Sequence, residues 1–212
     1  MVPRLQSVQT GLPEVLTDNG GWVSSIFKKP VDHLVWLDRL NLEGDAQADL
    51  KVHGGPDKAV CVYAADHFAT WRSELGVDCE GGAFGENFSV LGQTEQTVSI
   101  GDVFEIGTAV VQVSQPRGPC WKLARRWKRP DFPRLVLRTG RTGWYFRVLT
   151  PGRLEPGDSL RVVDRPCGDW TIARVNDVMY APRSSWDAAA ARALADCEPL
   201  TESWRDALRD RL

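Results

Sequence analysis

The sequence predicts a mainly β body, a barrel or a sandwich with a few inserted helices, followed by a small appendage of three helices. Up to about residue 166, short apolar stretches alternate with turns rich in Gly, Pro, Asn and Asp, which is typical of such β folds. After residue 166 the composition changes, and apolar residues recur four apart, as in helices. We therefore expect a β domain at 1–166 and a three-helix segment at 167–212.

The composition is that of a globular protein. The chain has 212 residues, of which 42% are hydrophobic and 25% charged, and its net charge of −2 gives no reason to expect nucleic-acid binding. Its five cysteines lack CxxC spacing, which excludes a disulfide framework or a zinc site and fits a reducing cytosol. No apolar run is long enough for a membrane span, and the chain begins without a secretion signal. We expect a cytoplasmic protein that binds neither nucleic acid nor membrane.

The first half of the body is expected to consist of short strands and one helix. The helix has apolar residues at 68, 71 and 75, which we interpret as a core stripe, and Gly76 ends it. In the strand expected at 83–90, Glu86 and Asn87 are adjacent and should face opposite sides unless the strand bulges. The expected strands are 5–9, 22–27, 33–40, 60–63 and 83–90, and the expected helix is 65–75.

The second half begins with a hairpin whose turn is Gly107-Thr108. Its second strand leads into a cysteine-containing loop and a short helical segment. In the appendage, Ser184 is expected to cap the middle helix, with Asp187 at its third position. The expected strands are 101–107, 109–113, 143–149 and 159–163, and the expected helices are 121–127, 132–139, 171–180, 186–197 and 203–212.

The strongest functional signal is the stretch from Ser114 to Cys120. Two prolines and a glycine make it a stiff turn between a strand and a helix, so that Cys120 should lie at the helix N-terminus. Arg117, Lys122 and Arg125 add positive charge nearby. Such surroundings lower the pKa of a cysteine from about 8.5 and make its thiolate available as a nucleophile or metal ligand.

A second, weaker signal is His53-Gly54-Gly55-Pro56-Asp57-Lys58. Paired glycines permit positive φ angles and close approach to a ligand, and His53 and Lys58 flank them as a titratable group and a cation. The same letters also describe an ordinary turn. The motif gains functional meaning only if the fold carries it to Cys120.

Several motifs, taken in order, resemble those of MOSC-domain proteins of the YiiM type. They are Leu42-Glu43-Gly44-Asp45, the stretch 51–60, Phe84-Gly85-Glu86-Asn87, Gly101-Asp102, the stretch 114–120 and Arg141-Thr142-Gly143-Trp144-Tyr145. The resemblance runs from about residue 5 to the end and includes the three-helix segment.

The resemblance implies a β-barrel that binds the molybdenum cofactor, a molybdopterin whose dithiolene holds an oxo-molybdenum centre, with Cys120 as a ligand of the metal. It also implies reduction of N-hydroxylated compounds such as 6-hydroxylaminopurine to the amine, as detoxification. Pyridoxal phosphate binding is a further expectation. Only the strand around Lys28 fits the family pattern loosely.

The site residues follow from this resemblance. Cys120 and His53 are the catalytic candidates, with His53 either donating a proton near neutral pH or holding the glycine loop by a structural hydrogen bond. Glu86 is expected to orient His53 or Lys58, and Asn87 to bond the pterin or the substrate. Cations and free N–H groups would bind the phosphate. The cofactor-binding candidates are Lys28, Gly54, Gly55, Lys58, Glu86, Asn87, Ser114, Gln115 and Arg117.

The reduction needs electrons, and the sequence has no flavin, dinucleotide or iron–sulfur motif, so a separate reductase is expected. The three C-terminal helices are expected to dock that reductase or to form a homodimer. Two alternatives stay open: a non-catalytic carrier that holds the cofactor or a persulfide on Cys120, and a thiol hydrolase with a Cys120/His53 dyad.

Overall fold

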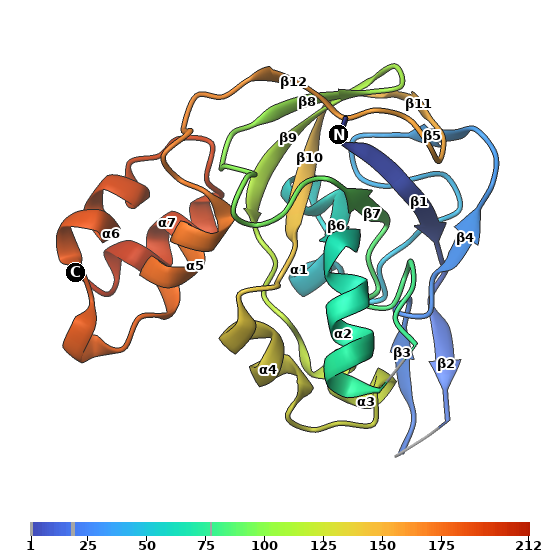
Figure 1. Ribbon diagram of the computed structural model, residues 1–212, viewed down its shortest axis with the longest axis horizontal. Coiled ribbons are helices and arrows are strands. Elements are labelled where there is room, and N and C mark those ends of the chain that lie inside the picture. Colours follow the sequence, from blue (N-terminus) through green and yellow to red (C-terminus); the bar gives the residue numbers. More distant parts are fainter. Residues whose placement is uncertain (1, 18–19, 77) are drawn as a thin grey trace.

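The computed structural model describes residues 2–17, 20–76 and 78–212. Its centre is a curled eight-stranded sheet with the order β12-β8-β9-β10-β6-β7-β1-β4 (Figure 1). Within it only β6 and β7 pair in parallel. Two small sheets pair β11 with β5 and β2 with β3. The strands are β1 Arg4–Thr10, β2 Glu14–Leu16, β3 Trp22–Ser24, β4 Lys29–Val31, β5 Val35–Leu37, β6 Val60–Ala64, β7 Phe88–Leu91, β8 Val103–Ile106, β9 Ala109–Pro116, β10 Trp144–Thr150, β11 Gly152–Leu154 and β12 Arg161–Asp164.

The curled sheet is a half-barrel, and backbone hydrogen bonds join parts of its two edges. Leu5 N donates to Asp158 O at 2.9 Å, and Gly157 N donates to Leu5 O at 2.8 Å. These bonds join the start of β1 to the segment that precedes β12. Because β4 and β12 do not pair within the described residues, the ladder itself stays open. The predicted barrel-like β body with inserted helices is confirmed.

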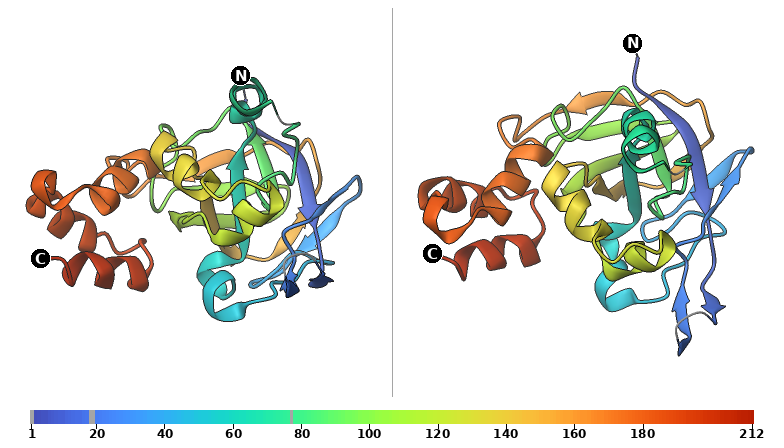
Figure 2. Two further views of the ribbon diagram at one scale, coloured as in Figure 1. Left: turned by 90° about the horizontal axis from the view of Figure 1, so that it is seen from below. Right: turned by 60° about the horizontal axis from the view of Figure 1, so that its bottom comes forward.

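The helices form two groups. In Figure 1, α2, α3 and α4 lie beside the lower half of the sheet, whereas α5, α6 and α7 form a separate bundle, which both views of Figure 2 also show. None of the described helices is long and apolar enough to cross a membrane. The bounds are α1 Leu50–His53, η2 Pro56–Lys58, η3 Ala65–His67, α2 Phe68–Leu75, α3 Trp121–Arg126, α4 Phe132–Thr139, α5 Ile172–Tyr180, η4 Arg183–Ser185, α6 Ala188–Ala195 and α7 Glu202–Arg209.

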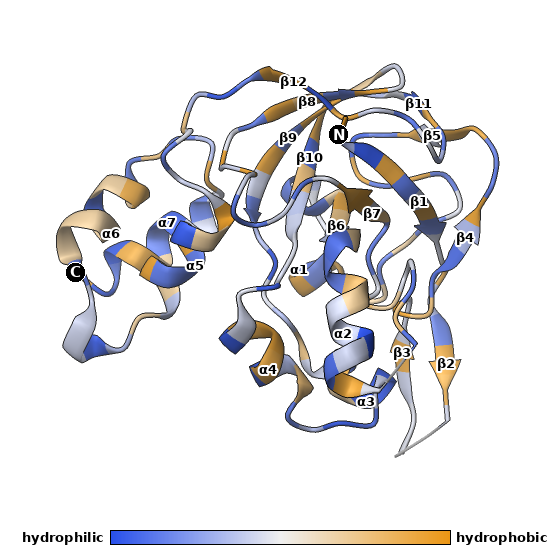
Figure 3. Cartoon of the chain, in the orientation of Figure 1, coloured by the Kyte–Doolittle hydropathy of each residue, from blue (hydrophilic) through white to orange (hydrophobic). Residues whose placement is uncertain are grey.

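Two clusters of buried apolar side chains hold these layers together. The larger fills the curled sheet and continues into α5, α6 and α7. The smaller joins α2, α3 and α4 to the sheet and contains Phe68 and Trp71, which confirms the predicted core stripe. Helix α4 shows the underlying amphipathic pattern: Phe132 and Val136 are buried on it, while strongly polar residues lie on its other side (Figure 3). Because the larger cluster crosses residue 166, the domain boundary there stays a prediction.

The strand expected at 83–90 is wrong over most of its length. Gly82 and Gly85 have φ angles of +85° and +75°, and the chain turns there before β7 begins at Phe88. The cause is Glu86, whose carboxylate accepts hydrogen bonds from Gly82 N at 2.7 Å and Phe84 N at 2.9 Å. Those N–H groups are therefore not available to a sheet ladder.

Other differences are local. Asp187, not Ser184, caps α6, since its carboxylate accepts from Ala189 N at 2.9 Å and Ala190 N at 3.0 Å. The three C-terminal helices themselves are confirmed. Residues 18–19, between the strands expected at 5–9 and 22–27, lie outside the described residues. The short elements α1, β2, β4 and β11 were not predicted, because three or four residues carry too little periodic signal.

Candidate functional site

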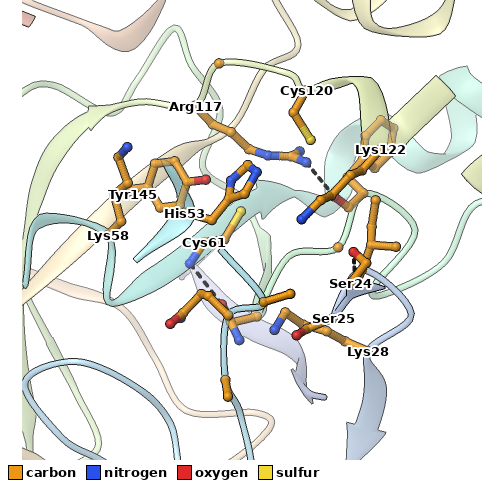
Figure 4. A pocket seen from close by; sticks show the side chains of 18 residues that line it. Ser24, Ser25, Lys28, His53, Lys58, Cys61, Arg117, Cys120, Lys122 and Tyr145 are labelled. Atoms are coloured by element: carbon orange, nitrogen blue, oxygen red, sulfur yellow. Dashed lines mark hydrogen bonds between the residues drawn. The ribbon is translucent and has the colours of Figure 1, made fainter. Parts of the chain in front are cut away.

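A pocket opens where several segments far apart in the sequence converge (Figure 4). It is lined by the loop after β3, residues 46–48, the segment from α1 to η2, residues 84–87 and the cysteine loop that leads into α3, together with one residue each of β6 and β10. About 610 Å³ of empty space lies within it, counting the open solvent at its mouth. The lining residues that carry polar or sulfur groups are Ser24, Ser25, Lys28, Gln47, His53, Lys58, Cys61, Asn87, Arg117, Cys120, Lys122 and Tyr145.

The fold brings the two sequence signals together. His53 and Lys58 of the glycine motif line the same pocket as Arg117 and Cys120 (Figure 4). The fold therefore brings this motif to Cys120, as its functional interpretation requires. Two further candidates, Lys28 and Asn87, also line it. The candidates that do not line the pocket are Gly54, Gly55, Glu86, Ser114 and Gln115.

Cys120 is the accessible thiol of the pocket. It stands at the N-cap of α3, as predicted, with extended backbone angles and no capping bond from its side chain. The thiol is free, and the residue is half-buried. Cys61, the other cysteine in the pocket, is buried, and burial raises the pKa of its thiol. A soluble reagent or a metal would therefore reach Cys120 first.

Arg117 presents an unsatisfied cationic group to the pocket. The residue is only 5% exposed, and its Nη2 donates to Phe84 O at 2.5 Å. Its Nη1 is buried without a hydrogen-bond partner in the described part of the chain. A buried charged donor without an acceptor is costly, so this atom is suited to an anionic ligand.

Lys122 is a pocket residue that the site prediction left out. It is 9% exposed, and no hydrogen bond or ion pair holds its amino group within the described ranges. The other two lysines are engaged. Lys58 Nζ donates to Val52 O at 2.7 Å, and burial lowers its pKa. Lys28 is ion-paired with the buried Asp45. Arg117 and Lys122 are therefore the cations best placed to receive an anion.

His53 is held in an unusual electrostatic environment. It ends α1, whose N-cap Asp49 accepts from Lys51 N at 3.1 Å and Val52 N at 3.2 Å. Burial and then the charges of Lys122, Arg117 and Lys58 lower the pKa of its imidazole to about 4. At neutral pH the ring is uncharged, which differs from the near-neutral proton donor that we expected.

The paired glycines shape the wall rather than line it. Gly55 has a φ of +99°, a region that side chains disfavour. A Cβ on Gly54 would lie 2.9 Å from Leu50 Cδ2 and 3.0 Å from Leu50 Cα, so no side chain fits there. The two glycines form the turn between α1 and η2, and this turn allows both His53 and Lys58 to line the pocket.

Glu86 was expected to orient His53 or Lys58, but its carboxylate forms a hydrogen bond with neither residue. Its fully buried carboxylate also accepts from Ser89 Oγ at 2.9 Å, in addition to Gly82 N and Phe84 N. It holds the turn whose Phe84 carbonyl in turn binds Arg117. Glu86 is a positioning residue for the pocket wall.

Replacement of Glu86 by alanine is expected to lower the free energy of unfolding by about 3 kcal/mol or more, because three buried donors lose a charged acceptor. Urea denaturation measures the effect. The exposed Glu14 is the control, and its replacement by alanine should change stability by less than about 0.5 kcal/mol. Equal effects of the two substitutions would contradict this role.

The side chains of the remaining candidates, Asn87, Ser114 and Gln115, already form hydrogen bonds within the protein. The Asn87 amide accepts from Cys61 N at 3.1 Å and donates to Asp45 Oδ2 at 2.9 Å. Ser114 Oγ donates to Asp57 O at 2.6 Å, which ties η2 to β9. Gln115 is buried, and its Nε2 donates to Pro116 O at 3.3 Å. Asn87 therefore lines the pocket with its amide already engaged, whereas Ser114 and Gln115 support the structure around it.

Cys61 and Tyr145 also line the pocket, although neither was among the predicted site residues. Tyr145 is buried on β10, where it stands opposite Gln115 on one side and Cys61 on the other. Burial, followed by the neighbouring Cys61, raises the pKa of its hydroxyl. The register of β10 would have placed both residues on the pocket, but the sequence alone does not give that register.

The comparisons with known proteins agree with this architecture. The family described as MOSC domain matches residues 49–161, and the family described as YiiM-like, 3-alpha helix domain matches residues 170–212. The Bacillus subtilis protein named "Uncharacterized protein YflK" is 44% identical over 210 residues, covering 97% of this chain and 94% of its own length.

Two further relatives are informative. The crystal structure of YiiM from Geobacillus stearothermophilus superposes with a TM-score of 0.85 at 39% identity and covers 99% of each chain. A Gibberella moniliformis protein named "Reductase" is 35% identical over 199 residues, which are 91% of this chain but 34% of that protein.

Proposed function

The chain belongs to the MOSC family and ends in a YiiM-like three-helix domain, and from this premise we propose that it is a molybdenum-cofactor-dependent reductase of N-hydroxylated compounds. Its substrates are then N-hydroxylated bases of the 6-hydroxylaminopurine type, reduced to the amine in detoxification. The observation that carries the proposal is the accessible thiol of Cys120 beside the unpaired cations of Arg117 and Lys122. The name of the Gibberella relative supports a reductase.

The groups that the pocket leaves unpaired fit the molybdenum cofactor. The orphaned Nη1 of Arg117 and the amino group of Lys122 suit the phosphate of a molybdopterin. The sulfur of Cys120 is a soft ligand of the kind that suits a polarizable metal. Held by these residues, the cofactor would supply the two electrons of the reduction.

His53 is proposed to deliver a proton. Reduction of R–NHOH to R–NH₂ and water consumes two electrons and two protons, and a donor near the leaving oxygen assists the loss of water. In the field of Lys122, Arg117 and Lys58, the imidazole is neutral at pH 7. A phosphate bound among these cations offsets their charge and raises the pKa of His53 toward neutrality. The proton donor is then active only while the anion is in place.

This coupling gives a test by NMR. Without an anion the pKa of His53 is expected near 4, below its usual 6.5, so His53 contributes stability above pH 6.5 that is lost as the pH falls through 4. Inorganic phosphate should raise the pKa of His53 and bind more tightly as the pH falls from 7. The chain has only three histidines, and a His53→Gln variant assigns the signal. A pKa near 6.5 that phosphate leaves unchanged would overturn the coupling.

Turnover with a chemical reductant tests the function itself. Protein loaded with molybdenum cofactor and supplied with a reduced viologen should convert 6-hydroxylaminopurine to adenine, while protein from a host that cannot make the cofactor should not. Bound cofactor without turnover would favour the carrier. Thiol-dependent hydrolysis without molybdenum would favour the hydrolase, although no hydrogen bond joins Cys120 to His53 in the ranges that the structure describes.

The electron source and the oligomeric state belong to the same proposal. We expect a separate reductase to deliver the electrons and the C-terminal helices to dock it or to form a homodimer. Pyridoxal phosphate carries a phosphate that would use the same cations. It is therefore expected to compete with inorganic phosphate for the pocket, which equilibrium binding measures.

A further inference from the structure

Two cysteines far from the pocket contact each other. The Cys197 thiol donates to the sulfur of Cys167, with the two Sγ atoms 2.8 Å apart. Cys167 precedes α5, and Cys197 follows α6. Both are free thiols, and no other cysteine pair in the described ranges is joined by a hydrogen bond. Neither residue takes part in the proposed reduction.

We propose that Cys167 and Cys197 form a reversible disulfide that ties the end of α6 to the segment between β12 and α5. A disulfide has an S–S length of about 2.05 Å, so the two sulfur atoms need to approach by less than about 1 Å. The pair is therefore already arranged for bond formation.

Packing around Gly101 holds the two cysteine segments together. A Cβ on Gly101 would lie 2.9 Å from Pro166 Cγ and equally close to Pro199 Cγ, so both prolines press on this one glycine. Pro166 directly precedes Cys167, and Pro199 lies two residues after Cys197. Backbone bonds fix the cysteines further: Cys167 O accepts from Trp170 N at 2.8 Å, and Cys197 O accepts from Leu200 N at 3.0 Å. The approach of the two thiols is thus imposed by the backbone.

The disulfide would act at the junction between the helices and the strand that leads to the pocket. Thr201, four residues after Cys197, donates its N–H to Ser114 O at 3.1 Å. Asn176 Nδ2 on α5 donates to Thr142 Oγ1 at 2.9 Å. A bond between residues 30 apart limits the unfolded conformations of the segment between them, which carries Asn176, and so stabilises the contact of Asn176 with Thr142.

The chemistry is thiol–disulfide exchange with a small disulfide such as oxidised glutathione. Cys167 is half-buried and accessible, whereas Cys197 is 6% exposed, and burial followed by its bond to Cys167 raises its pKa to about 12. The Cys167 thiolate attacks the reagent and releases one glutathione. The Cys197 thiolate then attacks the Cys167 sulfur and releases the second. Two protein thiols are oxidised, and one small disulfide is reduced to two thiols.

Oxidised glutathione tests the proposal on the full chain. After incubation, peptide mapping should find Cys167 linked to Cys197, and dithiothreitol should restore both thiols; a glutathione adduct on the accessible Cys120 is mapped separately. The melting temperature should rise by about 5 to 10 °C on oxidation, because the bond closes a loop of about thirty residues. These results do not depend on molybdenum or on turnover.

Two variants sharpen the test. Cys197→Ala should stop at a stable glutathione adduct on Cys167, without the rise in melting temperature. Cys79→Ala, at a buried cysteine outside the pair, should still form the bond. A glutathione adduct that persists on Cys167 in the wild type, a link between two chains, or unreacted Cys167 and Cys197 thiols would each overturn the proposal.

Discussion

Replacing Cys120 with alanine is expected to abolish turnover of 6-hydroxylaminopurine, by at least about a thousandfold or about 4 kcal/mol of transition-state stabilisation. The variant should also lose molybdenum, because among the described residues that line the pocket no other accessible sulfur could hold the metal. The residue caps no backbone group with its side chain, so the fold should persist. Metal analysis and a chemical-reductant assay on the same preparation measure both effects.

The matched control is Cys79→Ala, a cysteine in the smaller core cluster that does not line the pocket. It should keep molybdenum and turnover per bound metal, whatever it does to stability. Persistence of molybdenum and activity in Cys120→Ala would contradict the role of Cys120. Loss of activity with full molybdenum content would mean that Cys120 acts on the substrate and not on the metal.

Replacing Arg117 with methionine is expected to weaken phosphate binding by about a hundredfold, or about 2.7 kcal/mol, because a buried, charge-assisted donor is lost. Molybdenum retention should fall with it. Lys122→Met should have a smaller effect, about tenfold, since a flexible ammonium lacks the paired geometry of a guanidinium. Equilibrium binding of inorganic phosphate measures both.

Arg134→Met is the control for Arg117, because Arg134 is exposed on α4 and lies outside the pocket. It should bind phosphate as the wild type does. If Arg117→Met is folded and also binds phosphate normally, the anion is not held by the cations of this pocket, and the cofactor assignment loses its main electrostatic support.

The sequence predicted elements whose signals are local. Helix α4 has the bounds expected for it, because Gly140 ends a clear amphipathic pattern. The hairpin of β8 and β9 and the position of Cys120 before α3 were predicted from the same kind of signal. The curl of the sheet was implied only by family resemblance, since strand order depends on pairings between distant residues.

Within the site, the misassigned residues share one cause. Glu86 was expected to act on His53, but its carboxylate is used by the turn that it stabilises. Lys122 was noted as a nearby charge and Tyr145 as part of a motif, but neither was predicted as a site residue, because the side of a helix or strand that faces a pocket depends on tertiary packing. The low pKa of His53 arises from three cations that come from different segments. Such clustering becomes visible only when the fold is known.

The molybdenum-to-protein ratio of the wild-type chain, expressed in a host that makes the cofactor, tests the central claim most directly. The account predicts a ratio near one metal per chain, because the pocket offers one accessible thiol and one group of unpaired cations. A folded chain without molybdenum, from cells in which another molybdenum enzyme is fully loaded, would contradict it. Chemistry of the Cys120 thiol itself would then be the function to pursue.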